Sequence, residues 1–361
     1  MRRIRLSLAC LCLALALDAC AHPAPAIGEG DGATRRAARG ELLVGNKSAA
    51  SVWRLDLGDG RRLGEAATGE GPHEIVVVPG RRLAVVADYG AGPTPGHTLS
   101  VVDLDGGGTR RIDLGANTRP HGLRVLPGGR RVVATTEGSH ALLVVDLDEA
   151  RVEHVIDVGP GLGHMVALSA DGGTAYVSKL TAGSVVRVDL AAARAGATDA
   201  VREAPAGAGA EGIAVAPDGT VWVGNRDDDT VTVHDPDSLA VLATLASPGF
   251  PIRVAFTADG RHAVVTNARA ATLAVFDAAT RAPVATVALA AEGLEVRETL
   301  LGTAALPIGA VADPAGGRVY VAISGVDRIA VVDTARWAVE GYWRTGREPD
   351  ALAIAEAAAG P

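Results

Sequence analysis

Residues 210–246 read AEGIAVAPDGTVWVGNRDDDTVTVHDPDSLAVLATLA. Four short runs of mainly apolar and β-branched residues alternate with turn-forming groups: Pro-Asp-Gly at 217–219, an Asn/Asp cluster at 225–229, and Asp-Pro-Asp-Ser at 235–238. Short runs bounded by such residues are typical of β-strands joined by tight turns. The stretch therefore predicts four consecutive antiparallel strands, here named a, b, c and d in chain order.

The same unit recurs along most of the chain. Each copy has an a strand followed by a turn rich in Pro, Asp or Gly, then a b strand, then a c strand that ends in Asp. Besides the unit at 210–246, copies begin at Glu74, Gly122, Met165, Arg253 and Gly309. Their spacing of 41 to 56 residues is that of a β-propeller, in which each repeat forms one four-stranded blade.

The two ends of the repeat region are complementary fragments. Residues 41–67 supply b, c and d strands without an a strand, whereas 351–355 supply an a strand alone. Joining them in one blade closes the ring and removes two exposed sheet edges, which would otherwise invite aggregation. Six complete repeats and one composite blade predict an all-β, seven-bladed propeller of four-stranded antiparallel blades over residues 40–356, with a short tail at 357–361.

The repeat resembles a known pattern. Pro-Asp-Gly after strand a, Tyr/Trp-Val-(Ser/Gly)-(Asn/Lys) in strand b and Val-x-Val-x-Asp in strand c look like the YVTN repeat of the YncE-like and surface-layer propellers. The resemblance covers about residues 41–356 and implies the fold. At repeat level the chain also resembles the propeller domain of dissimilatory nitrite reductase. Such folds host binding proteins, hydrolases, lyases and haem proteins, so the resemblance assigns no catalytic residue.

The N-terminus predicts export. Three arginines lie within the first five residues, and Leu6–Leu17 form an apolar run too short to span a bilayer. The following Leu-Asp-Ala-Cys at 17–20 resembles a bacterial lipobox, which implies that 1–20 is a signal peptide and that Cys20 is lipidated. Cys20 is the only cysteine outside the apolar run, and a lipid thioether accounts for an unpaired thiol in an exported protein.

Two locations follow from this reading. Acylation of Cys20 predicts a lipoprotein on the periplasmic side of a bacterial membrane, joined to the propeller by a flexible tether at 21–39. A rival cleavage after Ala21 predicts a soluble periplasmic or secreted protein. The net charge of −8 is interspersed, without a basic stripe, which argues against nucleic acid as a partner.

A ring of side chains is predicted at one mouth of the central channel. In a propeller the a strands line the axis, and the d–a and b–c loops share one face. The residue just before each a strand, read around the repeats, is His73, His121, His164, Glu211, Ile252, Ile308 or Asp350. Glu74 and Arg253 follow one position later. We therefore predict a ligand-binding site at this mouth, formed by His73, His121, His164, Glu211, Arg253 and Asp350.

Three histidines and a carboxylate are a plausible set of ligands for zinc, copper or iron, so His73, His121 and His164 are candidate metal ligands. One of them could instead bind a non-covalent haem axially. A structural reading also stands, in which each imidazole bonds a neighbouring carbonyl. Adjacent blades share no sheet hydrogen bonds, so the three rings need not converge. Long segments at 89–97 and 290–306 are expected on the same face, where binding residues tend to lie.

Three functions remain open from the sequence. The first is a non-enzymatic binding or scaffold propeller that presents this face to an unidentified small ligand or envelope protein. The second is a metal- or haem-dependent, redox-associated function. The third, hydrolysis of a lactone-like substrate, rests on analogy with propeller lactonases. The chain has no Gly-x-Ser-x-Gly elbow, phosphate-binding loop or His-Glu-x-x-His motif.

Overall fold

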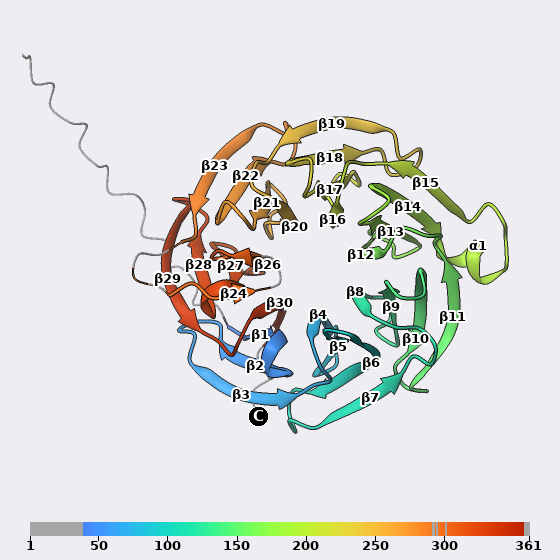
Figure 1. Ribbon diagram of the computed structural model, residues 1–361, viewed down its shortest axis with the longest axis horizontal. Coiled ribbons are helices and arrows are strands. Elements are labelled where there is room, and N and C mark those ends of the chain that lie inside the picture. Colours follow the sequence, from blue (N-terminus) through green and yellow to red (C-terminus); the bar gives the residue numbers. More distant parts are fainter. Residues whose placement is uncertain (1–38, 291–292, 294, 300–301, 357–361) are drawn as a thin grey trace, which may run out of the picture. The chain divides into compact units, whose positions relative to one another are not determined.

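A computed structural model describes residues 39–290, 293, 295–299 and 302–356. The predicted signal peptide with Cys20 and the tail at 357–361 lie outside the described residues, as does the tether except for residue 39. The described residues form seven four-stranded antiparallel sheets around a central axis, which confirms the predicted fold (Figure 1). Among them no helix has the length and apolarity needed to cross a bilayer.

Each blade runs from an inner a strand to an outer d strand. From the inner strand outward, the blades are β30 (Pro349–Ala355), β1 (Glu41–Asn46), β2 (Ser51–Asp56) and β3 (Arg62–Ala67); β4 (Pro72–Val78), β5 (Leu83–Ala91), β6 (Thr94–Asp103) and β7 (Thr109–Asp113); β8 (Pro120–Val125), β9 (Arg131–Thr136), β10 (Ala141–Asp146) and β11 (Arg151–Asp157); β12 (Gly163–Leu168), β13 (Thr174–Lys179), β14 (Ser184–Asp189) and β15 (Val201–Pro205); β16 (Ala210–Val215), β17 (Val221–Asn225), β18 (Thr230–His234) and β19 (Val241–Ala246); β20 (Pro251–Phe256), β21 (His262–Asn267), β22 (Thr272–Asp277) and β23 (Pro283–Ala288); and β26 (Pro307–Ala312), β27 (Arg318–Ile323), β28 (Arg328–Asp333) and β29 (Ala338–Arg344).

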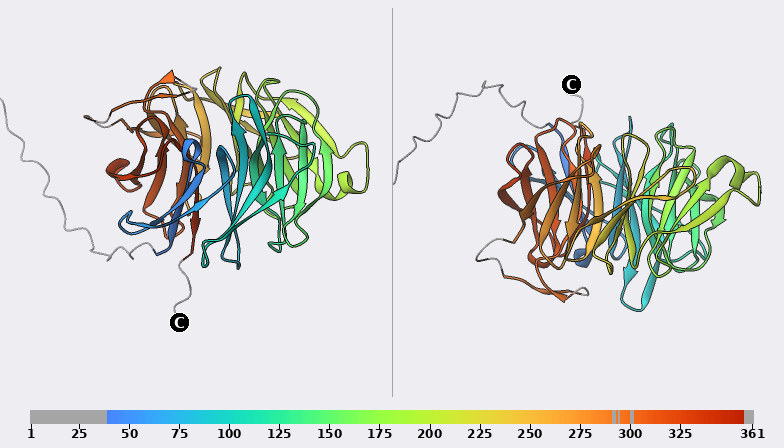
Figure 2. Two further views of the ribbon diagram at one scale, coloured as in Figure 1. Left: turned by 60° about the horizontal axis from the view of Figure 1, so that its bottom comes forward. Right: turned by 90° about the horizontal axis from the view of Figure 1, so that it is seen from above.

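Two small elements are added to this plan. A short helix, α1 (Leu190–Arg194), follows β14, and the Asp189 side chain caps it by accepting from the Ala192 amide. A two-stranded hairpin, β24 (Glu298–Thr299) and β25 (Gly302–Thr303), lies in the connection between the last two blades. Figure 2 shows this hairpin and the β5–β6 hairpin projecting from the same face of the ring, as the sequence predicted for both segments.

The ring closes as predicted, between the two ends of the chain. β30 pairs with β1 antiparallel, with Leu43 opposite Ala353 and Glu41 opposite Ala355. The Arg82 guanidinium from the next blade donates to the Glu41 carboxylate at 2.8 Å and to Asp105 at 3.0 Å. The first and last elements of the propeller therefore belong to one sheet, which an ion pair also links to its neighbour.

The core lies between the blades and is built from small apolar residues. The b and c strands are buried along almost their whole length, and their Val, Ala and Leu side chains from neighbouring blades pack together. Trp222 is one of the few large aromatics, with its ring 5.6 Å from that of Phe256 in the next blade. Val, Ile and Leu suit this position because they fit a pleated surface covered on both faces.

Hydroxyl groups link neighbouring blades, which the sequence did not predict. Thr135 in β9 donates its hydroxyl to the His164 carbonyl at 2.5 Å, and Ser178 in β13 donates to the Glu211 carbonyl at 2.5 Å. Thr266 in β21 donates likewise to Ile308 at 2.9 Å. Each hydroxyl reaches the second residue of the next a strand. The blades share no sheet bonds, as expected, but these side chains fix their a strands relative to one another.

Candidate functional site

All seven predicted ring positions line one cavity. It has a volume of about 930 Å³ and opens at the face that carries the β5–β6 and β24–β25 hairpins. Each ring residue is the second residue of its a strand, not the residue before it, because the strands begin earlier than predicted. The structure therefore brings together His73, His121, His164, Glu211, Arg253 and Asp350 at the channel mouth.

A glycine allows two of the histidines to meet. A Cβ at Gly122, next to His121, would lie 2.7 Å from the Val166 nitrogen and 2.9 Å from the His164 carbonyl oxygen. Only a residue without a side chain lets β8 approach β12 this closely. Thr135 holds the contact, since its hydroxyl accepts from the Gly122 amide while it donates to the His164 carbonyl. As a result the rings of His121 and His164 have centroids 3.8 Å apart.

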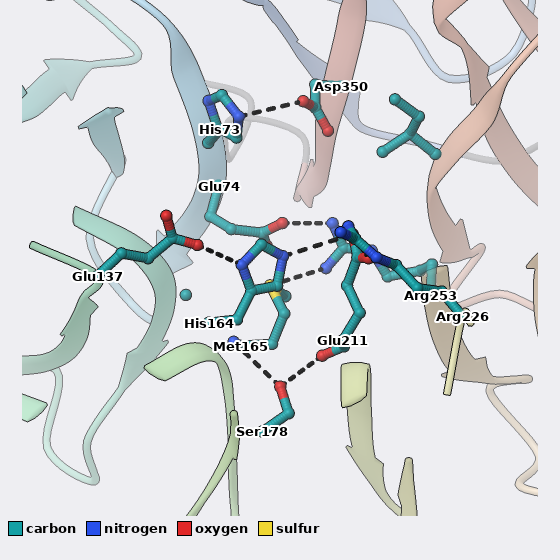
Figure 3. A network of polar contacts seen from close by, with 12 residues as sticks. His73, Glu74, Glu137, His164, Met165, Ser178, Glu211, Arg226, Arg253 and Asp350 are labelled. Atoms are coloured by element: carbon teal, nitrogen blue, oxygen red, sulfur yellow. Dashed lines mark hydrogen bonds and ion pairs between the residues drawn. The ribbon is translucent and has the colours of Figure 1, made fainter. Parts of the chain in front are cut away.

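His164 lies between two carboxylates. Its Nδ1 is 2.5 Å from Glu137 Oε1, and its Nε2 is 3.4 Å from Glu211 Oε1 (Figure 3). Burial by itself would lower the pKa of His164, but the hydrogen bonds and charges of Glu137 and Glu211 outweigh burial and raise the pKa to about 9. His164 is therefore an imidazolium at neutral pH, with Nδ1 hydrogen-bonded to Glu137 and Nε2 in a longer ion pair with Glu211.

Glu137 was missed by the sequence analysis. It follows β9 in a b–c loop, the class of loop that was predicted to share the face, but nothing in the repeat distinguishes it from other polar loop residues. Its other oxygen accepts from the Tyr89 hydroxyl at 2.5 Å. Desolvation and the neighbouring Glu137 carboxylate raise the pKa of Tyr89 to about 12, so Tyr89 stays protonated and donates this bond.

Two arginines complete the polar network. Arg226, also unpredicted, donates to Glu211 at 2.7 Å from the b–c loop of the same blade. Arg253 forms an ion pair with Glu74 from a blade across the channel (Figure 3). Desolvation disfavours the charge on Arg253, but Glu74 overcomes it and raises the pKa of Arg253 above its ordinary value. Both guanidinium Nε atoms are buried without a hydrogen-bond partner among the described residues.

His73 occupies a separate part of the pocket. Its Nδ1 lies 3.0 Å from the Gly71 carbonyl and its Nε2 3.9 Å from Asp350, which Lys47 also contacts at 3.3 Å. Desolvation lowers the pKa of His73 despite the attraction of Asp350. The carbonyl contact is the structural role that the sequence left open for these histidines, and it applies here to His73.

His121 is the neutral member of the group. Its ring is 6% exposed, and its Nδ1 has no hydrogen-bond partner among the described residues. Desolvation and then the positive charge of His164 hold the pKa of His121 well below its ordinary value. Two stacked imidazoles thus differ in charge because one has carboxylate partners and the other has none.

The charges that pair within the polar network balance. Lys47, Arg226, Arg253 and protonated His164 face an equal number of carboxylates. These carboxylates are Glu74, Glu137, Glu211 and Asp350. Arg119 also lines the cavity and donates to the Gly92 carbonyl. Opposite the histidines, Ile252 and Ile308 give the cavity an apolar side. A balanced pocket with one apolar side suits an uncharged, polar organic molecule better than an ion.

The residues that lie close enough together to bind a metal ion differ from the predicted ligands. Ligand atoms of His121, Glu137 and His164 lie within 4.8 Å of one another, whereas His73 is not part of this group. The rings of His121 and His164 are tilted by 36°, and Nδ1 of His164 already lies 2.5 Å from Glu137. The raised pKa of His164 keeps its imidazole protonated, and a protonated nitrogen cannot bind a metal ion.

Comparison with known proteins agrees with the fold. The model of a family described as lactonase, seven-bladed beta-propeller, matches residues 44–286. No curated protein matches the sequence.

Among similar solved structures are the periplasmic gluconolactonase PpgL of Pseudomonas aeruginosa, with 21% identity, 87% of this chain and 98% of that chain covered, and a TM-score of 0.67. A putative 6-phosphogluconolactonase of Bacteroides fragilis has 15% identity, coverages of 88% and 98%, and a TM-score of 0.69. The dihydro-heme d1 dehydrogenase NirN has 14% identity, coverages of 84% and 63%, and a TM-score of 0.61. At these identities the structures show a shared fold alone.

Proposed function

Because this chain belongs to the lactonase family of seven-bladed β-propellers, we propose that its channel-mouth pocket hydrolyses an uncharged cyclic ester. The observation that carries the proposal is the stacked pair His121–His164, in which His164 alone is bracketed by carboxylates. Two titratable groups whose surroundings push them into opposite charge states are the usual sign of an acid and a base in one site.

His121 acts as the general base. Its neutral imidazole lines the cavity beside His164. It removes a proton from a water molecule as the water oxygen bonds to the lactone carbonyl carbon. A positioned imidazole that is neutral at the operating pH is suited to this step.

Cationic groups beside His121 stabilise the resulting oxyanion. The Arg253 guanidinium and the His164 imidazolium both line the cavity. Donors fixed in place before the reaction lower the barrier more than mobile ones, because they need not reorganise. When the ring C–O bond breaks, the leaving alkoxide takes a proton from Nε2 of His164, the nitrogen that lies farther from its carboxylate. A water molecule then carries the proton of His121 to His164, which restores both groups, and the product is an open-chain hydroxy acid.

Charge and shape support an uncharged substrate. The four cations of the polar network are each paired with a carboxylate, so this network calls for no counter-charge on the ligand. The apolar side formed by Ile252 and Ile308 can contact the hydrocarbon part of a ring. The product carries a negative charge that the paired cations of the network do not neutralise, which favours its release.

This proposal replaces the ordering of functions that the sequence favoured. A non-enzymatic binding function finds no support in the family match. A haem-dependent function has support only from structures that share the fold at 14% identity. The closer resemblance to YVTN and YncE-like propellers remains a prediction from the repeat motif, compatible with membership of the broader lactonase family.

Hydrolysis of a lactone panel tests the proposal. Purified protein is incubated with γ-butyrolactone, δ-valerolactone and glucono-δ-lactone, and acid release is followed by pH-stat titration against buffer alone. At least one lactone is expected to open with saturation kinetics. A His154→Ala variant, changed in the outer strand β11, should retain the rate. Rates equal to buffer across uncharged five- and six-membered lactones would refute the proposal.

We further propose that the protein is exported and anchored through Cys20. The support is the lipobox-like segment at 17–20 and the single thiol outside the apolar run. A Cys20→Ala variant should move from the membrane fraction to the soluble periplasmic fraction. Unchanged fractionation of this variant would favour the rival cleavage after Ala21 or another cellular location.

A further inference from the structure

The opposite mouth of the channel holds a second cavity. It has a volume of about 650 Å³ and is lined by a–b turns, among them 127–129 and 169–172, and by the ends of β8, β12 and β16. The a strands run from the histidine ring at their start to these turns at their end, so the two cavities lie at opposite ends of the strands. Arg124 is the only charged side chain among the residues that line this second cavity.

Arg124 stands out from the other blades by its position in the repeat. It is the third residue after the ring histidine of β8. The corresponding residues of the other a strands are Val76, Ala167, Ala214, Ala255, Val311 and Ala353. Ala167 and Ala214 line the same cavity. A long cation therefore projects from a register position that carries a small apolar side chain in every other blade.

Arg124 has no carboxylate partner. Its Nη1 donates to the Leu123 carbonyl at 2.7 Å, and the described residues place no carboxylate within ion-pair distance of it. The carboxylate that acts on it electrostatically, Glu74, is already paired with Arg253. Desolvation lowers the pKa of Arg124, because burial makes the charged guanidinium less favourable. A bound anion would offset this loss of solvation.

The surroundings of Arg124 specify the rest of the ligand. Val125, Leu126, Leu168 and Val215 supply apolar walls, and the Ser169 hydroxyl is already engaged with Asp171. A guanidinium offers two parallel N–H donors that match a carboxylate. A cavity of this size, with apolar walls, polar turn backbone and a single charged side chain, is typical of a site for a small organic molecule whose charged end fixes its orientation.

We propose that this second cavity binds a small organic carboxylate with an apolar body, oriented by the Arg124 guanidinium. The site is distinct from the histidine pocket, and it stands whether or not the protein hydrolyses lactones. Because no residue of the acid–base group contributes to it, its occupation does not require catalysis.

Benzoate and benzamide form a matched pair of probes that differ in charge. Titration of ¹⁵N-labelled protein with benzoate should give saturable amide shifts in the turns at 127–129 and 169–172, and benzamide should give none. Arg124→Met keeps the side-chain length, packs among Val and Ala, and should weaken benzoate binding roughly tenfold or more. Arg124→Lys keeps the positive charge but loses the two parallel N–H donors of the guanidinium, so this variant should bind benzoate with intermediate affinity.

Two further results decide the assignment. His121→Gln should bind benzoate like the wild type, whereas Arg124→Met should retain lactone hydrolysis, so failure of one proposal does not mask the other. Equal benzoate binding by Arg124→Met, equal binding of benzamide, or shifts confined to the histidine pocket would each overturn the proposal. Absence of any saturable shift at millimolar benzoate would overturn it as well.

Discussion

The imidazole rings of His121 and His164 lie with their centroids 3.8 Å apart, although each comes from a different blade. Glu137 and Glu211 form ion pairs with His164, whereas no carboxylate of the described residues forms one with His121. One ring of the pair is thus charged and the other neutral, and the channel mouth gains an acid and a base in contact.

Replacing His121 should abolish turnover while leaving the fold intact. His121→Gln removes the general base, and we expect kcat/KM for a lactone to fall by about 100-fold or more. His121 makes no hydrogen bond through Nδ1, so the loss of stability should be small. Circular dichroism melting checks the fold, with His154→Ala as the control. A variant that melts much earlier, with proportional loss of activity, would assign His121 a structural role.

The activity should depend on pH mainly on the alkaline side. His121 must be neutral, and its pKa lies well below its ordinary value, so the base is available throughout the neutral range. His164 must be protonated, and its pKa is raised to about 9, so the rate should fall as the pH rises through that value. The measurement is kcat/KM against pH, corrected for spontaneous alkaline opening of the lactone.

Glu137→Gln tests the cause of that profile. The amide can still accept a hydrogen bond but carries no charge, so the pKa of His164 should fall and the alkaline limb should move to lower pH. Tyr89→Phe removes only the hydroxyl that donates to Glu137, and a smaller effect on the limb is expected. An alkaline limb that stays in place in Glu137→Gln would show that His164 is not the acid.

The close approach of β8 and β12 should be needed for activity. A Cβ at Gly122 would lie 2.7 Å from the Val166 nitrogen, so Gly122→Ala must push the two strands apart and unstack the histidines. We expect a loss of activity larger than the loss of stability would explain. Gly341→Ala in β29 is the matched control, because nothing lies within 4 Å of the Cβ it adds. Equal activity of the two variants would contradict this account.

The inner strand of the composite blade should be essential for stability. Deleting 349–361 removes β30 and leaves the β1 edge without a partner. The buried Ala351, Ala353 and Ala355 are lost with it, and we expect the melting temperature to fall by about 10 °C or more, with aggregation. Deleting only 357–361 should change neither. A cooperative, unchanged melt of the longer deletion would argue against closure through this strand.

Hydrolysis should not depend on a transition metal. His164 is hydrogen-bonded to Glu137, and its raised pKa keeps the imidazole protonated, which is unfavourable for binding an ion. Dialysis against EDTA is expected to leave kcat/KM unchanged, and elemental analysis of protein purified without a His tag should find much less than one equivalent of zinc, copper or iron. Stoichiometric metal whose removal abolishes activity would instead support the metal site.

The fold was predictable because it is local and repeated. Pro-Asp-Gly turns, alternating Val-rich runs and complementary fragments at 41–67 and 351–355 required no knowledge of distant contacts. The ring positions, His73 to Asp350, followed from their place before or within each a strand. Each repeat has the same order of strands and turns, so the strands assigned in one copy predicted those in the other copies.

The charges within the site depended on contacts between blades. Glu137 and Arg226 lie in b–c loops and Tyr89 near the end of β5, where no fixed sequence pattern marked them as partners of the ring. Whether His121 is neutral and His164 charged depends on which carboxylates reach each ring across a blade boundary. That distance is set by Gly122, by the Thr135 hydroxyl and by the closure of the whole propeller. The sequence by itself therefore determined the seven blades and the ring of residues at one mouth, and only the tertiary structure decided which of those residues can act as acid and which as base.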